Sequence, residues 1–183
     1  MNKIQSLTVF ATAALLLAAC SPGPADAEKS VDSGMAPAPK TEVKRYPIPG
    51  SDFPIANAVE VPADTTLVYL SGKTPAPAKP DAEKFSAEFW GDTETQTVSA
   101  LTRIQETLAG MGLDMGDVVK MQAFLVGVPE ADGMLDFEGF MAGYTQFFGG
   151  EAQPNLPART TVQVAGLVAP GMLVEIDVIA AKP

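Results

Sequence analysis

The chain has 183 residues, and its 12 Lys and Arg residues against 22 Asp and Glu residues give a net charge of −10. Proteins that bind nucleic acid rely on basic patches, so this acidic balance argues against RNA or DNA as a partner. The sequence has no histidine and only one cysteine. It therefore lacks the residues for serine–histidine or cysteine–histidine catalysis and for histidine-ligated metal sites.

The first twenty residues have the pattern of an export signal. Lys3 supplies a positive charge, and residues 7–17 form an uncharged apolar stretch. This stretch is shorter than the roughly 20 apolar residues that a membrane-spanning helix needs, and the combination is typical of a secretory signal. Residues 17–20 (LAAC) resemble the bacterial lipobox, in which the cysteine is acylated and becomes the new N-terminus. An ordinary signal peptide followed by an unrelated cysteine is the alternative.

We accordingly predict three parts: a lipoprotein signal peptide at 1–19, a disordered tether at 20–45 and one folded domain at 46–183. The tether is rich in Pro, Ala, Ser and Gly and shows no apolar periodicity. A lipid on Cys20 would hold the exported protein on a membrane in the periplasm. Ser21 after the cysteine favours the outer membrane over the inner one, by the sorting rule of enteric bacteria. With Cys20 acylated, the mature protein has no free thiol.

The domain has the length of a single unit, and its periodicities predict elements in a clear order. Two strands, 56–61 and 67–71, are expected to pair through a turn at 62–64. A helix should begin after an N-cap at Asp92 and run to about Gly110, because its apolar residues recur at steps of three and four. Then follow, in order, a strand at 117–126, a helix at 134–148, and two adjacent strands at 159–165 and 172–181, joined by a short Pro-Gly loop.

This order predicts a two-layer α+β domain with two helices on one side of a mixed sheet. Aromatic residues on one side of the second helix (Phe137, Phe140, Tyr144 and Phe147) are expected to belong to the core. Alternation predicts that the apolar residues of the last two strands face the helices: Thr160, Val162, Val164, Val174, Ile176, Val178 and Ala180. The opposite face should carry Arg159, Thr161, Gln163, Glu175 and Asp177. Packing against copies of the chain would cover that face and place Arg159, Gln163 and Glu175 in an interface cleft.

Several blocks in the domain resemble the Rid family (reactive intermediate deaminases, also called the YjgF family). They are LVYLSGKTPA at 67–76, QTVSALTRIQETLAGMGLDMGDVVKMQAFL at 96–125, YTQFF at 144–148, PARTTVQVAGL at 157–167 and VEIDVIA at 174–180. The resemblance covers about residues 46–182. It implies a chorismate-mutase-like fold assembled as a trimeric barrel, with ligand sites in the clefts between subunits.

The resemblance also implies an activity, the hydrolysis of reactive enamines and imines such as 2-aminoacrylate to 2-oxo acids and ammonium. Arg159 matches an arginine that takes the substrate carboxylate, a role that suits its planar fork. Glu175 matches a glutamate that positions or activates water. Ser71 matches a serine near the ligand, and the backbone N–H of Thr161 stands where the family uses a residue two past the arginine. This chemistry needs no cofactor and no metal.

Three positions depart from the best-known deaminase branch. Ile55 stands where that branch has a tyrosine, Met141 where it has an asparagine, and Thr161 where it often has a cysteine. A pocket more apolar than that of the archetype is the expected result. Structural roles remain open alternatives for Arg159 and Glu175 as an ion pair, and for Ser71 as a turn residue before a glycine.

Three functions compete. The first is an exported enamine/imine deaminase that acts on a small 2-imino acid. The second is a non-catalytic trimeric module that binds small carboxylates through Arg159, which the departures at Ile55 and Met141 favour. The third is an endoribonuclease, which the acidic chain and the missing histidines disfavour.

The lipobox interpretation predicts the behaviour of Cys20→Ser. The variant should remain full-length or be cleaved at the wrong position, and it should no longer partition with membranes, because it has no thiol to acylate. Membrane fractionation and palmitate labelling measure this. A variant that stays on the membrane and still takes up palmitate would show that the anchor is not a lipid on Cys20.

Overall fold

The computed structural model describes residues 42–182. The predicted signal peptide, Cys20 and most of the predicted tether lie outside these residues. Within the described range, no helix combines the length and apolarity needed to cross a membrane.

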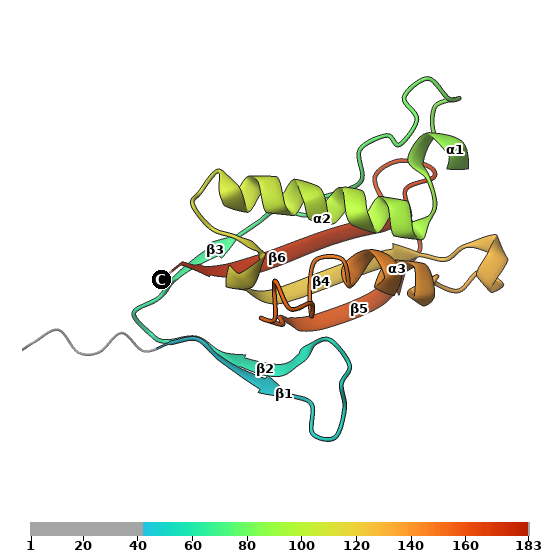
Figure 1. Cartoon of the computed structure of the whole chain (residues 1–183). Helices are drawn as coiled ribbons and strands as arrows, with labels where there is room; N and C mark the ends of the chain where they lie inside the picture. The colour runs from blue at the N-terminus through green and yellow to red at the C-terminus, as the bar shows by residue number, and fades with distance from the viewer. Residues whose placement is uncertain (1–41, 183) are drawn as a thin grey trace, which may run out of the picture. The chain divides into compact units, whose positions relative to one another are not determined.

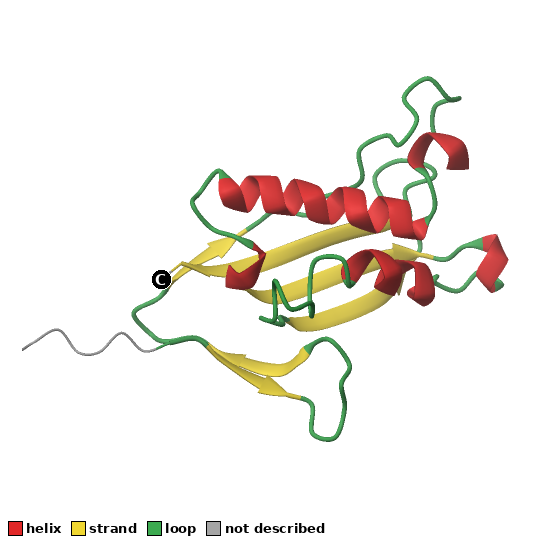
Figure 2. Ribbon diagram, in the orientation of Figure 1, coloured by secondary structure: helices red, strands yellow, loops and turns green. Residues whose placement is uncertain are grey.

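A six-stranded mixed sheet forms one layer of the domain (Figures 1 and 2). Its strands are β1 (Lys44–Pro47), β2 (Ala56–Glu60), β3 (Thr66–Tyr69), β4 (Val118–Val126), β5 (Ala158–Val164) and β6 (Val174–Lys182). They lie in the order β1-β2-β5-β4-β6-β3. β5 runs parallel to both β2 and β4, and the other pairs are antiparallel. The mixed sheet is confirmed.

The second layer consists of helices on one face of the sheet, as predicted (Figure 1). The long helix α2 (Thr93–Ala109) begins after the predicted N-cap Asp92, whose carboxylate accepts a hydrogen bond of 2.8 Å from the Thr95 N–H. α3 (Phe137–Tyr144) is shorter than predicted and connects the parallel strands β4 and β5. A third helix that the sequence did not predict, α1 (Ala87–Trp90), spans four residues. Short 3₁₀ turns, η1 (Met115–Asp117) and η2 (Pro129–Ala131), flank β4.

The strand pairing differs from the prediction in two places. β2 and β3 do not form a hairpin; they stand in different halves of the sheet, because β2 pairs with β1 and β5 whereas β3 pairs with β6. β5 and β6 are not neighbours, since β4 lies between them. β1 itself was not predicted, and it already begins at Lys44, inside the segment assigned to the tether.

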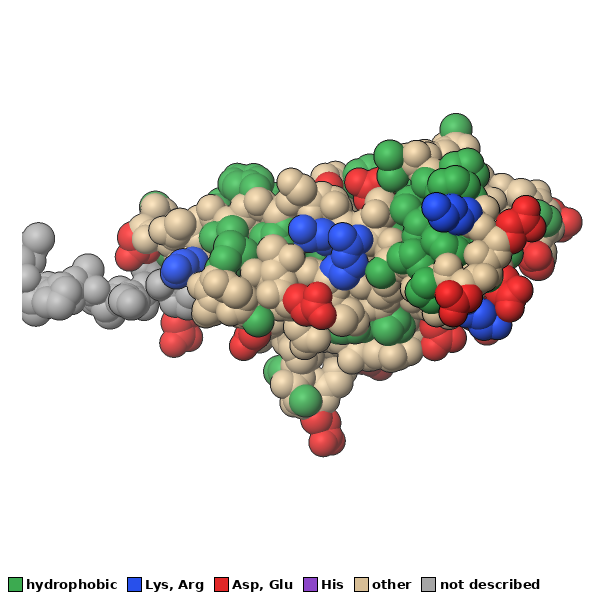
Figure 3. Space-filling model, turned by 90° about the horizontal axis from the view of Figure 1, so that it is seen from above, with side chains coloured by type: hydrophobic (Ala, Val, Ile, Leu, Met, Phe, Trp, Pro, Cys, Tyr) green, Lys and Arg blue, Asp and Glu red, His purple; other side chains and the backbone are tan. Residues whose placement is uncertain are grey.

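The core fills the space between the helices and the central strands β4 and β6. Its fully buried side chains include Leu101, Ile104 and Leu108 from α2, Met121 and Leu125 from β4, and Val174 and Ile176 from β6. The predicted alternation of β6 is confirmed. Phe89 and Trp90 of α1 form a smaller cluster with Met172. Hydrophobic side chains also gather on the surface at this end of the molecule (Figure 3).

The predicted faces of β5 are inverted. Arg159, Thr161 and Gln163 stand in register with the buried residues Met121, Ala123 and Leu125 of β4, so they face the helices. Val162 points to the other face and is 41% exposed. The prediction placed valines inside and the arginine outside because it weighed side chains by polarity alone.

The β1–β2 hairpin is held to the rest of the domain at few points. β2 pairs with β5 only at Ala56 and Ala158. Arg45 donates hydrogen bonds to the carbonyl oxygens of Leu156 (3.2 Å), Gly116 (2.7 Å) and Val118 (3.1 Å). Beyond Ala158, the edge of β5 that faces the hairpin pairs with no strand of the described chain. Side chains of the hairpin loop can therefore approach Arg159.

The close contact between α2 and α3 yields a stability prediction at Gly143. A Cβ atom there would lie 2.7 Å from the Thr97 Cβ and 3.0 Å from the Glu94 carbonyl oxygen. Gly143→Val should destabilise the domain by about 2–3 kcal/mol, because the helices must separate. Urea unfolding of the purified protein measures this.

Gly150→Val is the matched control, since nothing lies within 4 Å of its Cβ position. It should change the unfolding free energy by no more than about 0.5 kcal/mol. Equal losses in the two variants would contradict the close helix packing.

Candidate functional site

The guanidinium of Arg159 lies inside a group of four aromatic rings. Its Cζ atom is 4.3 Å from the ring centroid of Tyr144, 5.0 Å from Phe140, 5.4 Å from Phe53 and 5.9 Å from Phe137. We call these four residues the aromatic box. Each distance is within the range of a cation–π contact. The negative faces of the rings thus stabilise a cation that would otherwise be costly to bury.

The box is assembled from two distant parts of the chain. Phe137, Phe140 and Tyr144 occupy one face of α3, at spacings of three and four residues. Phe53 comes from the loop between β1 and β2. The Tyr144 hydroxyl donates a hydrogen bond of 2.8 Å to the Pro54 carbonyl oxygen, which ties this loop to the helix. The prediction of an aromatic core is therefore confirmed for Phe140 and Tyr144 and wrong for Phe137, which is 40% exposed; all three rings surround Arg159.

Two buried side-chain atoms on β5 have no partner among the described residues. Arg159 Nη1 and Thr161 Oγ1 are buried, and neither makes a hydrogen bond within the described chain. They lie on the same face of β5, two residues apart, or roughly 6.6 Å along the strand. Within residues 42–182 the ion pairs are Lys44–Glu60 and Lys79–Glu88, so no carboxylate pairs with Arg159. Buried polar groups are nearly always satisfied, so this pair of atoms indicates a place for an anionic or hydrogen-bonding ligand.

Burial changes the acid–base properties of the box. It lowers the pKa of Arg159 below its ordinary value, although an arginine keeps its proton in proteins. Burial also raises the pKa of the Tyr144 hydroxyl, so this group remains neutral. Arg159 is therefore a permanent cation in apolar surroundings. The four residues of the aromatic box supply no general acid or base.

Glu175 and Ser71 form a second group, around a close approach of β6 to the chain that follows β3. A side chain at Gly72 would collide with the Glu175 carboxylate. Lys73 pairs with Ile176 through hydrogen bonds of 2.8 and 3.1 Å, which holds residues 71–73 beside β6. Ser71 is exposed, and Glu175 is partly exposed. The carboxylate thus lies against a glycine at an accessible edge.

One chain does not bring the two groups together. Arg159 stands in register with Met121, and Glu175 stands in register with Phe124. Met121 and Phe124 are three residues apart on β4 and point to opposite faces. Arg159 and Glu175 therefore lie on opposite faces of the sheet, and the prediction that they share a face on adjacent strands is wrong. This arrangement also removes the alternative of an Arg159–Glu175 ion pair within one chain.

Gln163 has a structural role on the helix side. Its side chain donates to the Gly133 carbonyl oxygen (2.8 Å) and accepts from the Leu135 N–H (2.9 Å). These bonds fix the loop that leads into α3. The predicted place of Gln163 in a cleft on the open face is therefore wrong.

The two departures from the family pattern, Ile55 and Met141, are both partly buried and pack against the main core. Neither supplies a polar group to the site. The aromatic residue of this loop that does reach Arg159 is Phe53, two positions before Ile55. Phe53 was not predicted as a site residue, because it lies in a Pro- and Gly-rich segment without periodicity. Phe140 was predicted as a core residue alone.

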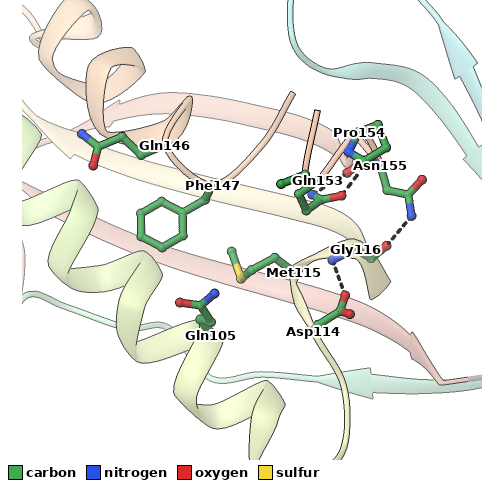
Figure 4. A pocket seen from close by; sticks show the side chains of 10 residues that line it. Gln105, Asp114, Met115, Gly116, Gln146, Phe147, Gln153, Pro154 and Asn155 are labelled. Atoms are coloured by element: carbon green, nitrogen blue, oxygen red, sulfur yellow. Dashed lines mark hydrogen bonds between the residues drawn. The ribbon is translucent and has the colours of Figure 1, made fainter. Parts of the chain in front are cut away.

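A separate cavity of about 550 Å³ lies between α2, the end of α3 and the loop at 149–157 (Figure 4). Several of its polar groups already bond to one another: Gln153 Nε2 to the Asn155 carbonyl oxygen (2.9 Å), and the Gly116 N–H to Asp114 (2.7 Å). None of the predicted site residues lines it. In the described part of the chain, no group of three or more Cys, Asp or Glu residues is arranged to hold a metal ion.

The sequence matches a family described as "Endoribonuclease L-PSP" over residues 51–182. It is 29% identical to TdcF of Escherichia coli K12, which is named as a reactive intermediate deaminase, over 119 residues that cover 65% of this chain and 80% of that protein. It is 30% identical over 120 residues to a RutC family protein of Haemophilus influenzae, with the same coverage.

Solved structures share the fold. A Rid family protein, YyfB of Yersinia pestis, superposes with a TM-score of 0.54 at 21% identity, covering 70% of this chain and 87% of that protein. The crystal structure of E. coli TdcF with bound serine superposes with a TM-score of 0.50 at 27% identity, covering 79% of this chain and 100% of that protein. The chorismate-mutase-like, Rid-type domain predicted from the sequence is thus confirmed.

The unpartnered Nη1 atom of Arg159 predicts binding of small carboxylates. A 2-oxo acid such as pyruvate should raise the melting temperature of the protein, by the equivalent of about 2.7 kcal/mol at 100 times its dissociation constant. Arg159→Lys should lose most of this stabilisation, because an ammonium cannot hold both carboxylate oxygens. Arg103→Lys is the control: Arg103 is exposed on α2, bonds the Thr74 carbonyl and should keep the full shift. Equal shifts in both variants would mean that the ligand binds elsewhere.

Proposed function

The chain belongs to the Rid/YjgF family, through its match to Endoribonuclease L-PSP over residues 51–182, and we propose that it hydrolyses 2-imino acids and their enamine tautomers to 2-oxo acids and ammonium. The observation that carries the proposal is the buried guanidinium of Arg159 with its unpartnered Nη1. The names of the relatives and the serine bound to TdcF agree with a small ligand that bears a carboxylate. We further propose that the reaction takes place in the periplasm, on a protein anchored through Cys20.

Binding begins with the carboxylate. Its two oxygens fit the planar fork of Arg159, and the aromatic box lowers the local dielectric so that this pair is stronger than in water. The Thr161 hydroxyl, also unpartnered, lies on the same strand face and would bond the carboxylate or the imine nitrogen. The ligand would thereby satisfy both buried atoms that the protein leaves open.

Hydrolysis then needs only a positioned water. Water adds to the carbon of the protonated imine, and the carbinolamine formed expels ammonia as the C–N bond breaks, which leaves the 2-oxo acid. Overall, one iminium and one water give one 2-oxo acid and one ammonium. Glu175 is the group that would orient the water and accept its proton. No step requires a metal, a cofactor or a covalent intermediate.

Because Arg159 and Glu175 lie on opposite faces of the sheet in one chain, a site that contains both must draw them from two subunits. The face that bears Glu175 has the character of an interface. It is not covered by the helices (Figure 1) and exposes apolar side chains, among them Tyr69 (71%) and Val162 (41%). We propose that this face closes a homotrimer, as the family resemblance implies, with three sites between subunits.

A non-catalytic receptor for small carboxylates is the second candidate. Ile55 and Met141 favour it, because both pack on the core and bring no polar group to the site. Such a module would keep the binding by Arg159 and have no use for Glu175. RNA cleavage is not proposed, since the chain has no histidine and a net charge of −10.

The kinetic test compares Arg159→Lys with Glu175→Gln. Arg159→Lys should cost about 2–4 kcal/mol in kcat/KM, the scale of one charge-assisted contact. Glu175→Gln should mainly lower kcat, because it removes the group that handles water and leaves the carboxylate contact intact. The assay follows ammonium released from imines that an amino-acid oxidase makes in situ, corrected for spontaneous hydrolysis. If the wild type binds 2-oxo acids through Arg159 yet never exceeds the spontaneous rate, it is a receptor.

Mixing the two variants tests the shared site. Every mixed trimer has one interface where an intact Arg159 meets an intact Glu175 of the neighbour. Random assembly of equal amounts should therefore restore roughly a quarter of the wild-type activity, and each variant alone should stay inactive. Light scattering should give the mass of three subunits. A monomer mass, or no recovery after subunits have exchanged, would exclude the intersubunit site.

A further inference from the structure

Two rings of the aromatic box differ from the other two in exposure. Phe53 is 38% exposed and Phe137 is 40% exposed, whereas Phe140 and Tyr144 are fully buried. Phe53 and Phe137 stack on each other with their centroids 6.3 Å apart and an angle of 19° between their planes. They form the accessible wall of the box, which we call the Phe53–Phe137 pair.

We infer that the Phe53–Phe137 pair recognises the substrate side chain, and that the site prefers 2-imino acids with a large apolar side chain, above all an aromatic one, over those as small as 2-aminoacrylate. This inference rests on the proposed function, because it assumes that the carboxylate binds Arg159. It concerns which members of the substrate class the site selects.

The Phe53–Phe137 pair lies close to the place where Arg159 would bind the substrate carboxylate. A carboxylate oxygen bonded to the guanidinium lies about 2.8 Å from its nitrogen. The side chain of a 2-imino acid starts at the second carbon from that carboxylate, within the reach of a short molecule. The rings of Phe53 and Phe137 stand 5.4 and 5.9 Å from Arg159 Cζ. A ligand held by Arg159 would therefore have its side chain within reach of these two exposed rings.

The chemistry of the box disfavours a polar side chain. Three of its four residues are phenylalanines, and the only side-chain hydroxyl, on Tyr144, already donates to Pro54 at 2.8 Å. A ligand hydroxyl in this region would lose water without gaining a partner, which weakens binding. An aromatic ring would instead meet ring faces and edges in the offset arrangements that aromatic pairs favour.

The pair is also held in place. The Phe53 N–H bonds the Ser51 hydroxyl (3.2 Å), and the Phe53 carbonyl accepts from the Ile55 N–H (2.8 Å). The Ala56 N–H donates to Pro157 (3.0 Å), and Pro54 accepts from Tyr144. Phe137 stands at the start of α3, which Asp136 caps by accepting from the Gly139 N–H at 2.9 Å. Both rings are thus positioned by the fold, as a selective subsite requires.

The test measures kcat/KM for imines made in situ from phenylalanine, leucine and alanine, with the purified protein. The imine from phenylalanine should be preferred over that from alanine by about 30-fold or more, with leucine between them. Phe53→Ala and Phe137→Ala should each lower the preference, measured as the ratio of kcat/KM for the phenylalanine imine to that for the alanine imine, by about 10-fold. Phe53→Tyr, which keeps the ring, should retain the preference.

Phe85→Ala is the matched control, because Phe85 is an exposed aromatic residue (50%) next to α1, outside the box. It should leave all three rates unchanged. Turnover without a size preference, or a preference that survives both alanine variants, overturns the inference and leaves the proposed function standing.

If no imine is hydrolysed, the proposed reaction is overturned. Calorimetric titration with phenylpyruvate and pyruvate then tests the selectivity by itself. If phenylpyruvate then binds at least 10-fold more tightly than pyruvate, and the difference disappears in Phe53→Ala, the selectivity stands as that of a receptor. Equal affinity for the two acids, or no binding of either, overturns the inference as well.

Discussion

The buried cation of Arg159 is the constraint on which the rest of the site depends. A guanidinium under a helix, with no carboxylate of residues 42–182 paired to it, is stabilised here by rings 4.3–5.9 Å away. This requirement explains why α3 presents three aromatic residues on one face, and why the β1–β2 loop is tied to Tyr144 through Pro54. The rings stabilise the charge, but Nη1 has no hydrogen-bond partner among the described residues and is therefore available to a ligand. Stability and binding therefore depend on the same residues.

The sheet divides the candidate machinery between its two faces. β5 turns Arg159 and Thr161 toward the helices, whereas β6 turns Glu175 toward the face that the helices leave uncovered. A reaction that needs a cation for the carboxylate and a carboxylate for water would then require two chains. The apolar exposure of the uncovered face, with Tyr69 at its edge, supplies a physical reason for such an assembly. In this view, the interface would complete the site as well as stabilise the oligomer.

Most of the local structure was predictable because it follows from short-range patterns. The α2 helix and its cap at Asp92 obey the spacing and capping rules, and the alternation of β6 matches its observed burial. β5 failed the same alternation rule, because its inward face carries Arg159, Thr161 and Gln163, whose burial depends on partners elsewhere in the chain. Pairing failed for a related reason: nearness in sequence suggested a β2–β3 hairpin, but β2 instead meets β5 about 100 residues later.

The sequence by itself determined the α+β class, the family and the absence of histidine, because composition, periodicity and motif order need no three-dimensional information. Arg159 and Glu175 were singled out by the resemblance to the family. The tertiary structure alone decided that Arg159 is boxed by rings, that Phe53 joins the box, and that Glu175 lies on the other side of the sheet. Each of these depends on contacts between segments distant in the chain, and a burial preference read from one residue cannot anticipate the partner that makes burial of a charge favourable.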